Sequence, residues 1–282
     1  KKLHLLLLIF LGLIFASEPS FGQEYLSAPT HPTHYFDFKV GQKVYVFGDR
    51  VNVRDVPTTK GHILTTLSVG AIVEVVEVLT IEDQMPIIVN GLEGPWVRVK
   101  YDDSGASGFI WAPLLTSIGL PTPHYTYLFG LVKADEEKLY GQLRAIKYND
   151  IWEKIDFEAI GDLEHFLVHA RIYGNRGYKA FDHIIELHFE SSEGIHGLGH
   201  LTFFNSHDGV YYAGRHLQHV NNDYKQTYNH LVYPNDKGGQ TNRILKRKKV
   251  FISDDIGNRE ITETLTVWDW HEALEKLVRV KQ

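Results

Sequence analysis

Short alternations of apolar and polar residues fill the first part of the chain from about residue 40 onward. They occur, with turn residues between them, at residues 43–46, 51–54, 71–79, 96–99 and 108–111. Alternation with a period of two over short runs is typical of half-buried β-strands. Strands that recur every ~10 to 20 residues are typical of a small antiparallel barrel. The pattern therefore predicts a β-domain over residues 38–118.

The alternation is interrupted at residues 119–123, Gly-Leu-Pro-Thr-Pro, and resumes beyond them. Pro and Gly together mark a boundary between domains. Residues 165–173 and 182–190 alternate again and have Gly-Asn-Arg-Gly between them, so we predict a hairpin. Further strands are expected at residues 200–204, 210–212, 228–233, 249–253 and 260–268. Residues 124–282 are therefore predicted to form a second, β-rich domain.

One segment of this second part has a helical pattern instead. Within residues 133–147, Leu139, Leu143 and Ile146 recur at helical spacing. Acidic residues stand at positions 135–137, where they would complement the positive end of a helix dipole. The spacing predicts a helix over residues 133–147.

The N-terminal residues have the pattern of an export signal. Two lysines are followed by an apolar run over residues 5–15 and by small residues up to Gly22. The run is shorter than the about 20 residues that a membrane span needs, and the order of the three parts is that of a secretory signal peptide. We expect a signal peptide at residues 1–22 and a linker at 23–37. The mature protein would then be exported, periplasmic or extracellular in a bacterium, with no membrane span after cleavage. A retained membrane anchor is the alternative.

Composition narrows the partners and the chemistry. The 282 residues include 29 Lys and Arg against 35 Asp and Glu, a net charge of −6. An acidic chain has no general attraction to nucleic acid, so no nucleic-acid partner is expected. Cysteine is absent, which excludes disulfides, thiolate zinc sites and cysteine nucleophiles. No cofactor is expected.

Four segments of the first domain resemble the bacterial SH3 domain. They are Val-Asn-Val-Arg-Asp-Val-Pro at 51–57, Leu-Ser-Val-Gly-Ala-Ile-Val-Glu-Val at 67–75, Gly-Pro-Trp-Val-Arg-Val-Lys-Tyr at 94–101 and Gly-Phe-Ile-Trp at 108–111. Their order and spacing match that family. Two departures are Asp55-Val56, where a small pair is usual before the proline, and the insert at residues 80–93.

The resemblance implies an SH3-like barrel that serves as a binding module on exported bacterial proteins, often for cell-wall peptides. The family has no catalytic residues to carry over. We expect a ligand groove near Tyr45, Arg54, Trp96 and Trp111, although both tryptophans could instead cover the ends of the barrel as core residues. The expected fold class is mainly β, with an N-terminal SH3-like barrel followed by an antiparallel, β-rich domain that contains one or two helices.

No hydrolase signature occurs in the chain. His-Glu-x-x-His, His-x-His, Gly-x-Ser-x-Gly and Ser-x-x-Lys are all missing. The chain nevertheless has 16 histidines, most of them in the second domain. If the predicted hairpin turns at residues 174–177, His165 faces Glu186 and His169 faces Asp182. His165, His169 and Glu186 are therefore the candidates for acid–base catalysis, and cross-strand hydrogen bonding is their simpler interpretation.

A glycine-rich segment offers the best metal-site candidates, His196 and His200 in Gly-Ile-His-Gly-Leu-Gly-His. Glycines let the backbone fold both imidazoles inward. Structural histidines on a sheet face are the alternative. The basic residues at 243–249 are interpreted as a solvated strand, or as a contact for an anionic envelope polymer.

These observations favour an exported, non-enzymatic protein that binds peptidoglycan, another envelope ligand or a protein partner. The alternative is a wall hydrolase, of peptide or glycan, with a histidine–carboxylate or metal site in the second domain. A third interpretation is that the SH3-like barrel only packs against its neighbour.

Overall fold

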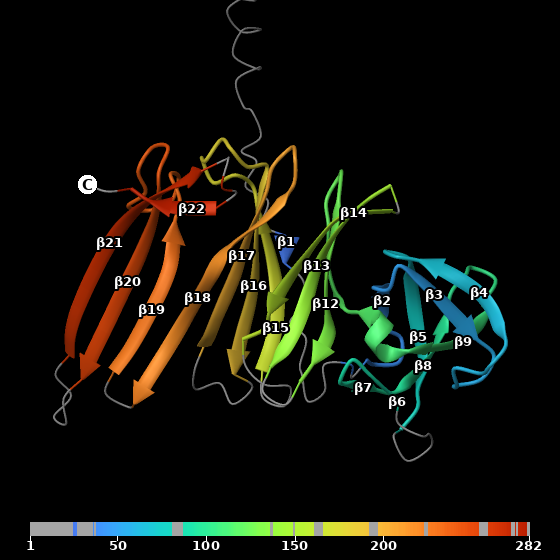
Figure 1. Cartoon of the computed structure of the whole chain (residues 1–282). Helices are drawn as coiled ribbons and strands as arrows, with labels where there is room; N and C mark the ends of the chain where they lie inside the picture. The colour runs from blue at the N-terminus through green and yellow to red at the C-terminus, as the bar shows by residue number, and fades with distance from the viewer. Residues whose placement is uncertain are drawn as a thin grey trace, which may run out of the picture.

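The structure is a computed structural model that describes residues 25–26, 36, 38–80, 87–135, 138–148, 150–160, 166–191, 197–222, 225–253, 259–271, 274 and 276–280. Almost all of these residues belong to antiparallel strands or to the turns between them (Figure 1). Within these ranges, the helical residues are the 3₁₀ turn η2 (Ala112–Leu114) and residue 274. The mainly β fold class is confirmed.

A seven-stranded sheet forms the N-terminal barrel, as the alternation predicted. Its order is β10-β2-β5-β8-β9-β3-β4. The strands are β2 (Lys43–Val46), β3 (Arg50–Arg54), β4 (Ile63–Ser68), β5 (Ile72–Val78), β8 (Trp96–Lys100), β9 (Ser107–Trp111) and β10 (Leu115–Thr116). The expected insert contains the small hairpin of β6 (Ile87–Val89) and β7 (Leu92–Gly94). Alternate valines such as Val44, Val53 and Val99 point inward and are fully buried.

A four-stranded sheet follows, and it overturns the predicted helix. Its strands are β11 (Ile118–Pro121), β12 (Thr126–Ala134), β13 (Leu139–Lys147) and β14 (Asp150–Glu158). The helix over 133–147 is wrong because the described residues of this range include the end of β12 and the whole of β13. Asp135 accepts a hydrogen bond from the Lys138 amide at 2.8 Å, so Asp135 belongs to the connection between these two strands. Leu139, Leu143 and Ala145 are also compatible with period two, and pairing with β12 and β14 decides between the two patterns.

The rest of the chain forms a nine-stranded sheet in the order β1-β15-β16-β17-β18-β19-β20-β21-β22. Its strands are β1 (Tyr25–Leu26), β15 (Phe166–Tyr173), β16 (His183–Ser191), β17 (Gly197–Asn205), β18 (Val210–Asn222), β19 (Lys225–Val232), β20 (Ile244–Ser253), β21 (Arg259–His271) and β22 (Lys276–Arg279). Two residues of the expected linker thus form β1, which pairs with β15. The expected boundary segment also contributes to a strand, because Gly119 to Pro121 lie in β11.

The predicted hairpin of β15 and β16 is present, but its register differs from the expectation. His169 pairs with His188, and Arg171 pairs with Glu186. The expected pairings of Glu186 with His165 and of His169 with Asp182 are wrong because residues 174–182 form a longer connection than a tight turn. A change in loop length shifts every cross-strand partner.

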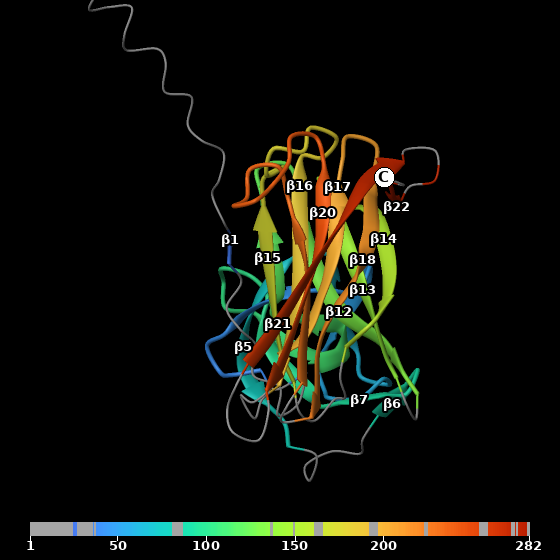
Figure 2. The same cartoon turned by 90° about the vertical axis from the view of Figure 1, so that its left-hand side faces the viewer.

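The barrel, the four-stranded sheet and the nine-stranded sheet follow one another along the molecule (Figure 1). Phe129 and Phe157 of the four-stranded sheet meet Phe203 of β17, with their ring centroids 5.9 and 5.8 Å from that of Phe203. The valines of the barrel belong to the same hydrophobic cluster, so one core continues through all three sheets. The long strand β18 pairs with β17 through its first part and with β19 through its last part. In Figure 2, β20 and β21 pass in front of β16 and β17.

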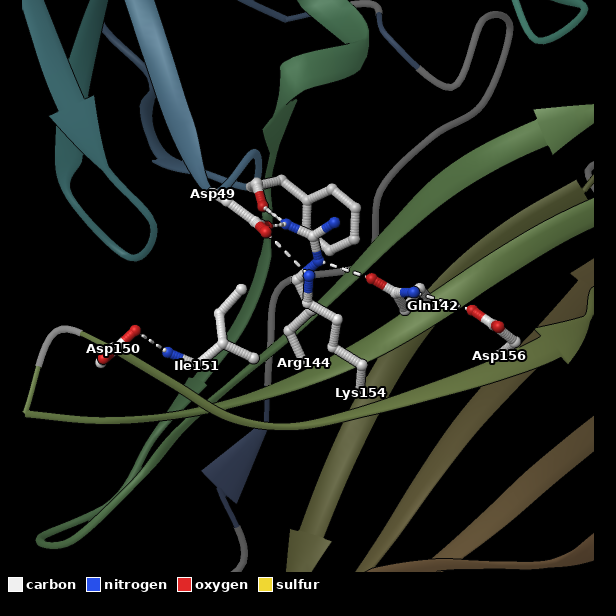
Figure 3. A network of polar contacts seen from close by, with 8 residues as sticks. Asp49, Gln142, Arg144, Asp150, Ile151, Lys154 and Asp156 are labelled. Atoms are coloured by element: carbon white, nitrogen blue, oxygen red, sulfur yellow. Dashed lines mark hydrogen bonds and ion pairs between the residues drawn. The ribbon is translucent and has the colours of Figure 1, made fainter.

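Aromatic side chains and one arginine join the barrel to the four-stranded sheet. Tyr45 lies against Gly119 and Phe47 against Gly130, so closely that a Cβ on either glycine would approach a ring atom to 2.3 or 2.6 Å. Arg144 of β13 donates to the Phe47 carbonyl and to Asp49 Oδ1, the latter at 2.6 Å (Figure 3). This junction fixes the orientation of the barrel.

Candidate functional site

The barrel has a shallow cleft of about 190 Å³ beside β2, β5 and β8. Lys43, Glu74 and Lys100 lie in its lining and form one row across the three strands, because β5 pairs Glu74 with both lysines. Ile72, which is 57% exposed, and Tyr101 belong to the same lining. The cleft therefore combines two amines and one carboxylate with apolar surface.

Two further carboxylates stand at the end of this cleft, in the turn after β8. Asp102 and Asp103 are exposed and complete the lining. Hydrogen bonds from the Ser104 hydroxyl at 2.7 Å and from the Ala106 amide at 2.9 Å lower the pKa of Asp102, so it is ionised at neutral pH. Amines and carboxylates in one cleft can bind a ligand that itself carries both charges. The sequence analysis did not single out these side chains, because only the strand register brings them together.

The structure places the four expected groove residues in different surroundings. Trp96 is 4% exposed and belongs to the core, while Tyr45 faces the junction with β11. Trp111 pairs with Trp96 across the strands, is partly exposed and donates from its indole nitrogen to the Gly94 carbonyl at 3.0 Å. Arg54 is also partly exposed and donates to the Gly61 carbonyl at 2.6 Å. Arg54 and Trp111 thus keep some surface for a ligand.

The second concentration of polar side chains is a row of four imidazoles on the nine-stranded sheet. His169, His188, His200 and His216 stand on β15, β16, β17 and β18 and are direct cross-strand partners, each of the next. Successive ring centroids are 4.9, 5.1 and 4.8 Å apart, and the rings are inclined by 3°, 25° and 31°. We call these four residues the histidine row. It lies on the face of β15–β17 opposite the common core.

The histidine row is largely shielded from solvent. His169, His200 and His216 are 7%, 6% and 3% exposed. Burial lowers the pKa of His200 to about 4 and that of His216 to about 3, so both are neutral at pH 7. Neither ring nitrogen of His216 has a hydrogen-bond partner among the described residues.

One buried carboxylate accompanies the row. Glu186 Oε2 accepts a hydrogen bond from His188 Nε2 at 2.9 Å. Burial by itself would raise the pKa of Glu186, but the hydrogen bond from His188 and the neighbouring positive charges lower it to about 2. Glu186 is therefore a carboxylate over most of the pH range.

The expected catalytic and metal candidates are only partly covered by the structure. His165 and His196 lie outside the described residues, whereas His169, Glu186 and His200 all belong to the row or contact it. Over the described ranges, no three histidine, aspartate or glutamate side chains are arranged to hold a metal ion. Nor do these ranges contain a helix with the length and apolar character needed to cross a membrane.

Sequence reasoning missed the histidine row as a unit. The strand pattern placed several histidines on sheet faces, but it could not show that four of them share one level. That requires the register of three successive hairpins.

The comparison with known protein families finds a match within the N-terminal barrel. Residues 49–116 match the family model of the bacterial SH3 domain. The comparisons with curated proteins and with solved structures each found no match. The match covers β3 to β10, the strands that carry the resembling segments in the sequence. The chain therefore contains a bacterial SH3 domain at residues 49–116, followed by further antiparallel β-sheet.

Proposed function

We propose that this chain is an exported, non-enzymatic binding protein whose bacterial SH3 domain recognises a cell-wall or other envelope ligand. The observation that carries the proposal is the family match at residues 49–116. Bacterial SH3 domains are binding modules that are often associated with the cell wall. Export rests on the pattern of residues 1–22, in which a positive start precedes a short apolar run and small residues.

The cleft beside β2, β5 and β8 supports a charged peptide as the ligand. Its lysines, Lys43 and Lys100, can pair with peptide carboxylates, while Asp102 and Asp103 can pair with peptide amines. The exposed Ile72 adds apolar contact between these charges. Wall stem peptides carry both kinds of charged group, so the chemistry of the cleft fits the ligand class of the family.

Sedimentation with purified peptidoglycan sacculi tests this proposal. The protein without residues 1–22 is mixed with sacculi, the sacculi are pelleted, and both fractions are analysed for protein and for released muropeptides. We expect protein in the pellet and intact sacculi. Protein that stays in the supernatant would contradict a wall ligand and favour a protein partner. Released muropeptides would favour the alternative of a wall hydrolase.

A charge reversal locates the binding surface. The double variant Lys43→Glu, Lys100→Glu leaves the buried valines of the barrel untouched but reverses two charges of the cleft. We expect binding to fall by about tenfold or more, since each lost charged contact at an interface contributes on the order of 1 kcal/mol. The double variant Lys60→Glu, Lys237→Glu is the matched control, because both lysines are exposed in turns and neither lines the cleft. Equal loss in both variants would mean that only net charge matters.

A further inference from the structure

The histidine row joins four neighbouring strands at one level of the sheet. Each inner imidazole, His188 or His200, has another imidazole on both sides, with centroids 4.8–5.1 Å apart. Since the four residues are direct cross-strand partners, their spacing is set by the hydrogen-bonded backbones of β15–β18. A change of side-chain rotamer moves the rings only a short way apart, so a larger separation requires the strands themselves to separate.

Charged groups surround the row on every element packed against it. The carboxylates next to the row are Glu186 and Glu190, both on β16. The cations are Arg171 on β15, Arg176 in the following loop and Lys246 on β20. His230 on β19 is a further titratable neighbour. The charged groups next to His230 are Arg247, Lys249, Glu263 and Asp236. The surroundings therefore have no excess of negative charge.

Two carboxylates contact the row, one at His188 and one at His169. Glu186 is hydrogen-bonded to His188, and Glu190 Oε1 lies 3.8 Å from His169 Nδ1. His200 and His216 form no ion pair with a carboxylate among the described residues. Glu186 acts on both as a negative neighbour from beyond contact distance, whereas Lys246 acts on His216 as a positive one. A proton on either of these two imidazoles would be a buried charge without a direct counter-charge.

We propose that the histidine row is an acid-sensitive latch, which holds β15–β18 together while its imidazoles are neutral and releases this part of the sheet when neighbouring imidazoles are protonated. Two adjacent imidazolium rings at 4.8 Å repel each other strongly in a buried setting. Opening of the strands relieves that repulsion and hydrates both charges.

The direction of the pH effect follows from linkage. Burial lowers the pKa of His200 from 6.5 to about 4 and that of His216 from 6.5 to about 3. The opened sheet therefore binds protons more readily than the closed sheet between these values. The closed state keeps its full advantage above about pH 6.5 and loses it as the pH falls toward 4 and then 3.

Hydrogen–deuterium exchange of the purified protein tests the latch. Exchange is followed by mass spectrometry from about pH 7 down to about pH 3.5 and corrected for the intrinsic pH dependence of each amide. We expect peptides from β16–β18 to lose protection about tenfold at a pH where peptides from β5 and β8 of the barrel remain protected. The loss should reverse on return to neutral pH.

Two substitutions remove a proton site but keep a ring in the stack. His200→Phe and His216→Phe should each move the opening of β16–β18 to lower pH, by about half a unit or more. His207→Phe is the control, because its side chain is 90% exposed and lies outside the row, so its midpoint should equal that of the unchanged protein. If a phenylalanine variant fails to fold, His200→Gln supplies an uncharged polar replacement for the same measurement.

Two results would overturn the proposal. One is simultaneous loss of protection in β5, β8 and β16–β18, which would show ordinary acid unfolding of the whole chain. The other is an unchanged opening midpoint in the folded variants of His200 and His216. An opening that shifts in these variants but not in the His207 control supports the latch.

Discussion

Replacing Arg144 with methionine removes the only cation that the described residues bury between the barrel and the four-stranded sheet. Its guanidinium donates to the Phe47 carbonyl, to Asp49 Oδ1 at 2.6 Å and to Gln142 Oε1 at 2.7 Å (Figure 3). It also lies 4.2 Å from the centroid of the Phe47 ring. Methionine keeps most of the apolar stem but loses every one of these polar contacts.

The size of the expected loss of stability follows from the burial of the Arg144 contacts. Leaving the Phe47 carbonyl without this donor costs about 1–3 kcal/mol, and loss of the cation over the ring costs about 0.5–2 kcal/mol. The ion pair adds no more than about 1 kcal/mol, because the Asp49 side chain is 55% exposed and solvent screens it. These terms overlap, since one group makes them all. We therefore expect Arg144→Met to lower the free energy of unfolding by about 3 kcal/mol.

Urea unfolding, followed by tryptophan fluorescence and far-ultraviolet circular dichroism, measures this loss. Lys154→Met is the matched control: Lys154 also pairs with Asp49, at 2.8 Å, but both side chains are well exposed. That variant should lose less than about 1 kcal/mol. Combining Arg144→Met with Asp49→Asn should give a coupling energy of about 1 kcal/mol. A loss for Arg144→Met no larger than that of the control would refute the reasoning.

Three further substitutions test the packing and the buried carboxylate. Gly130→Ala places a Cβ 2.6 Å from the Phe47 ring. We expect the free energy of unfolding, measured by urea titration, to fall by about 1–3 kcal/mol. An unchanged value would mean that the Phe47 ring moves aside at no cost. Phe203→Ala opens a cavity between two sheets and should cost about 3–5 kcal/mol by the same assay, and a loss below about 1 kcal/mol would contradict a shared core. Glu186→Gln should destabilise the protein at pH 7, because the pKa of Glu186 is lowered from 4.5 to about 2. The difference from the unchanged protein should shrink as the pH falls from about 4.5 toward 2, where the carboxyl is protonated, and a difference that is constant over this range in a pH series of unfolding curves would argue against a charge effect.

The barrel could be predicted because its evidence is local. Val44, Val53 and Val99 alternate with polar neighbours, and turn residues separate the runs, so strand positions follow from the order of side chains. The family segments add a known spacing to that pattern, and the match at residues 49–116 covers the same strands. Neither the alternation of side chains nor the spacing of the family segments depends on which distant strands pair.

The predicted helix over residues 133–147 and the predicted residue pairs of the β15–β16 hairpin were wrong for one reason: both depend on which strands and residues pair. Residues 139–146 fit both a helical and an alternating pattern, and the neighbouring strands β12 and β14 decide for a strand. The partner of Glu186 is Arg171 rather than His165 because the connection between β15 and β16 is longer than the turn residues indicated. Loop length is not encoded by the alternation of the strands themselves.

By itself, the sequence determined the strand-rich character, the position of the barrel and the apolar faces of its strands, because these depend on the period of apolar side chains along a short segment. Only the tertiary structure decided that Lys43, Glu74 and Lys100 share a cleft and that His169, His188, His200 and His216 form one row. Such groupings depend on register, and register is selected by burying whole faces against one another, which no single segment specifies.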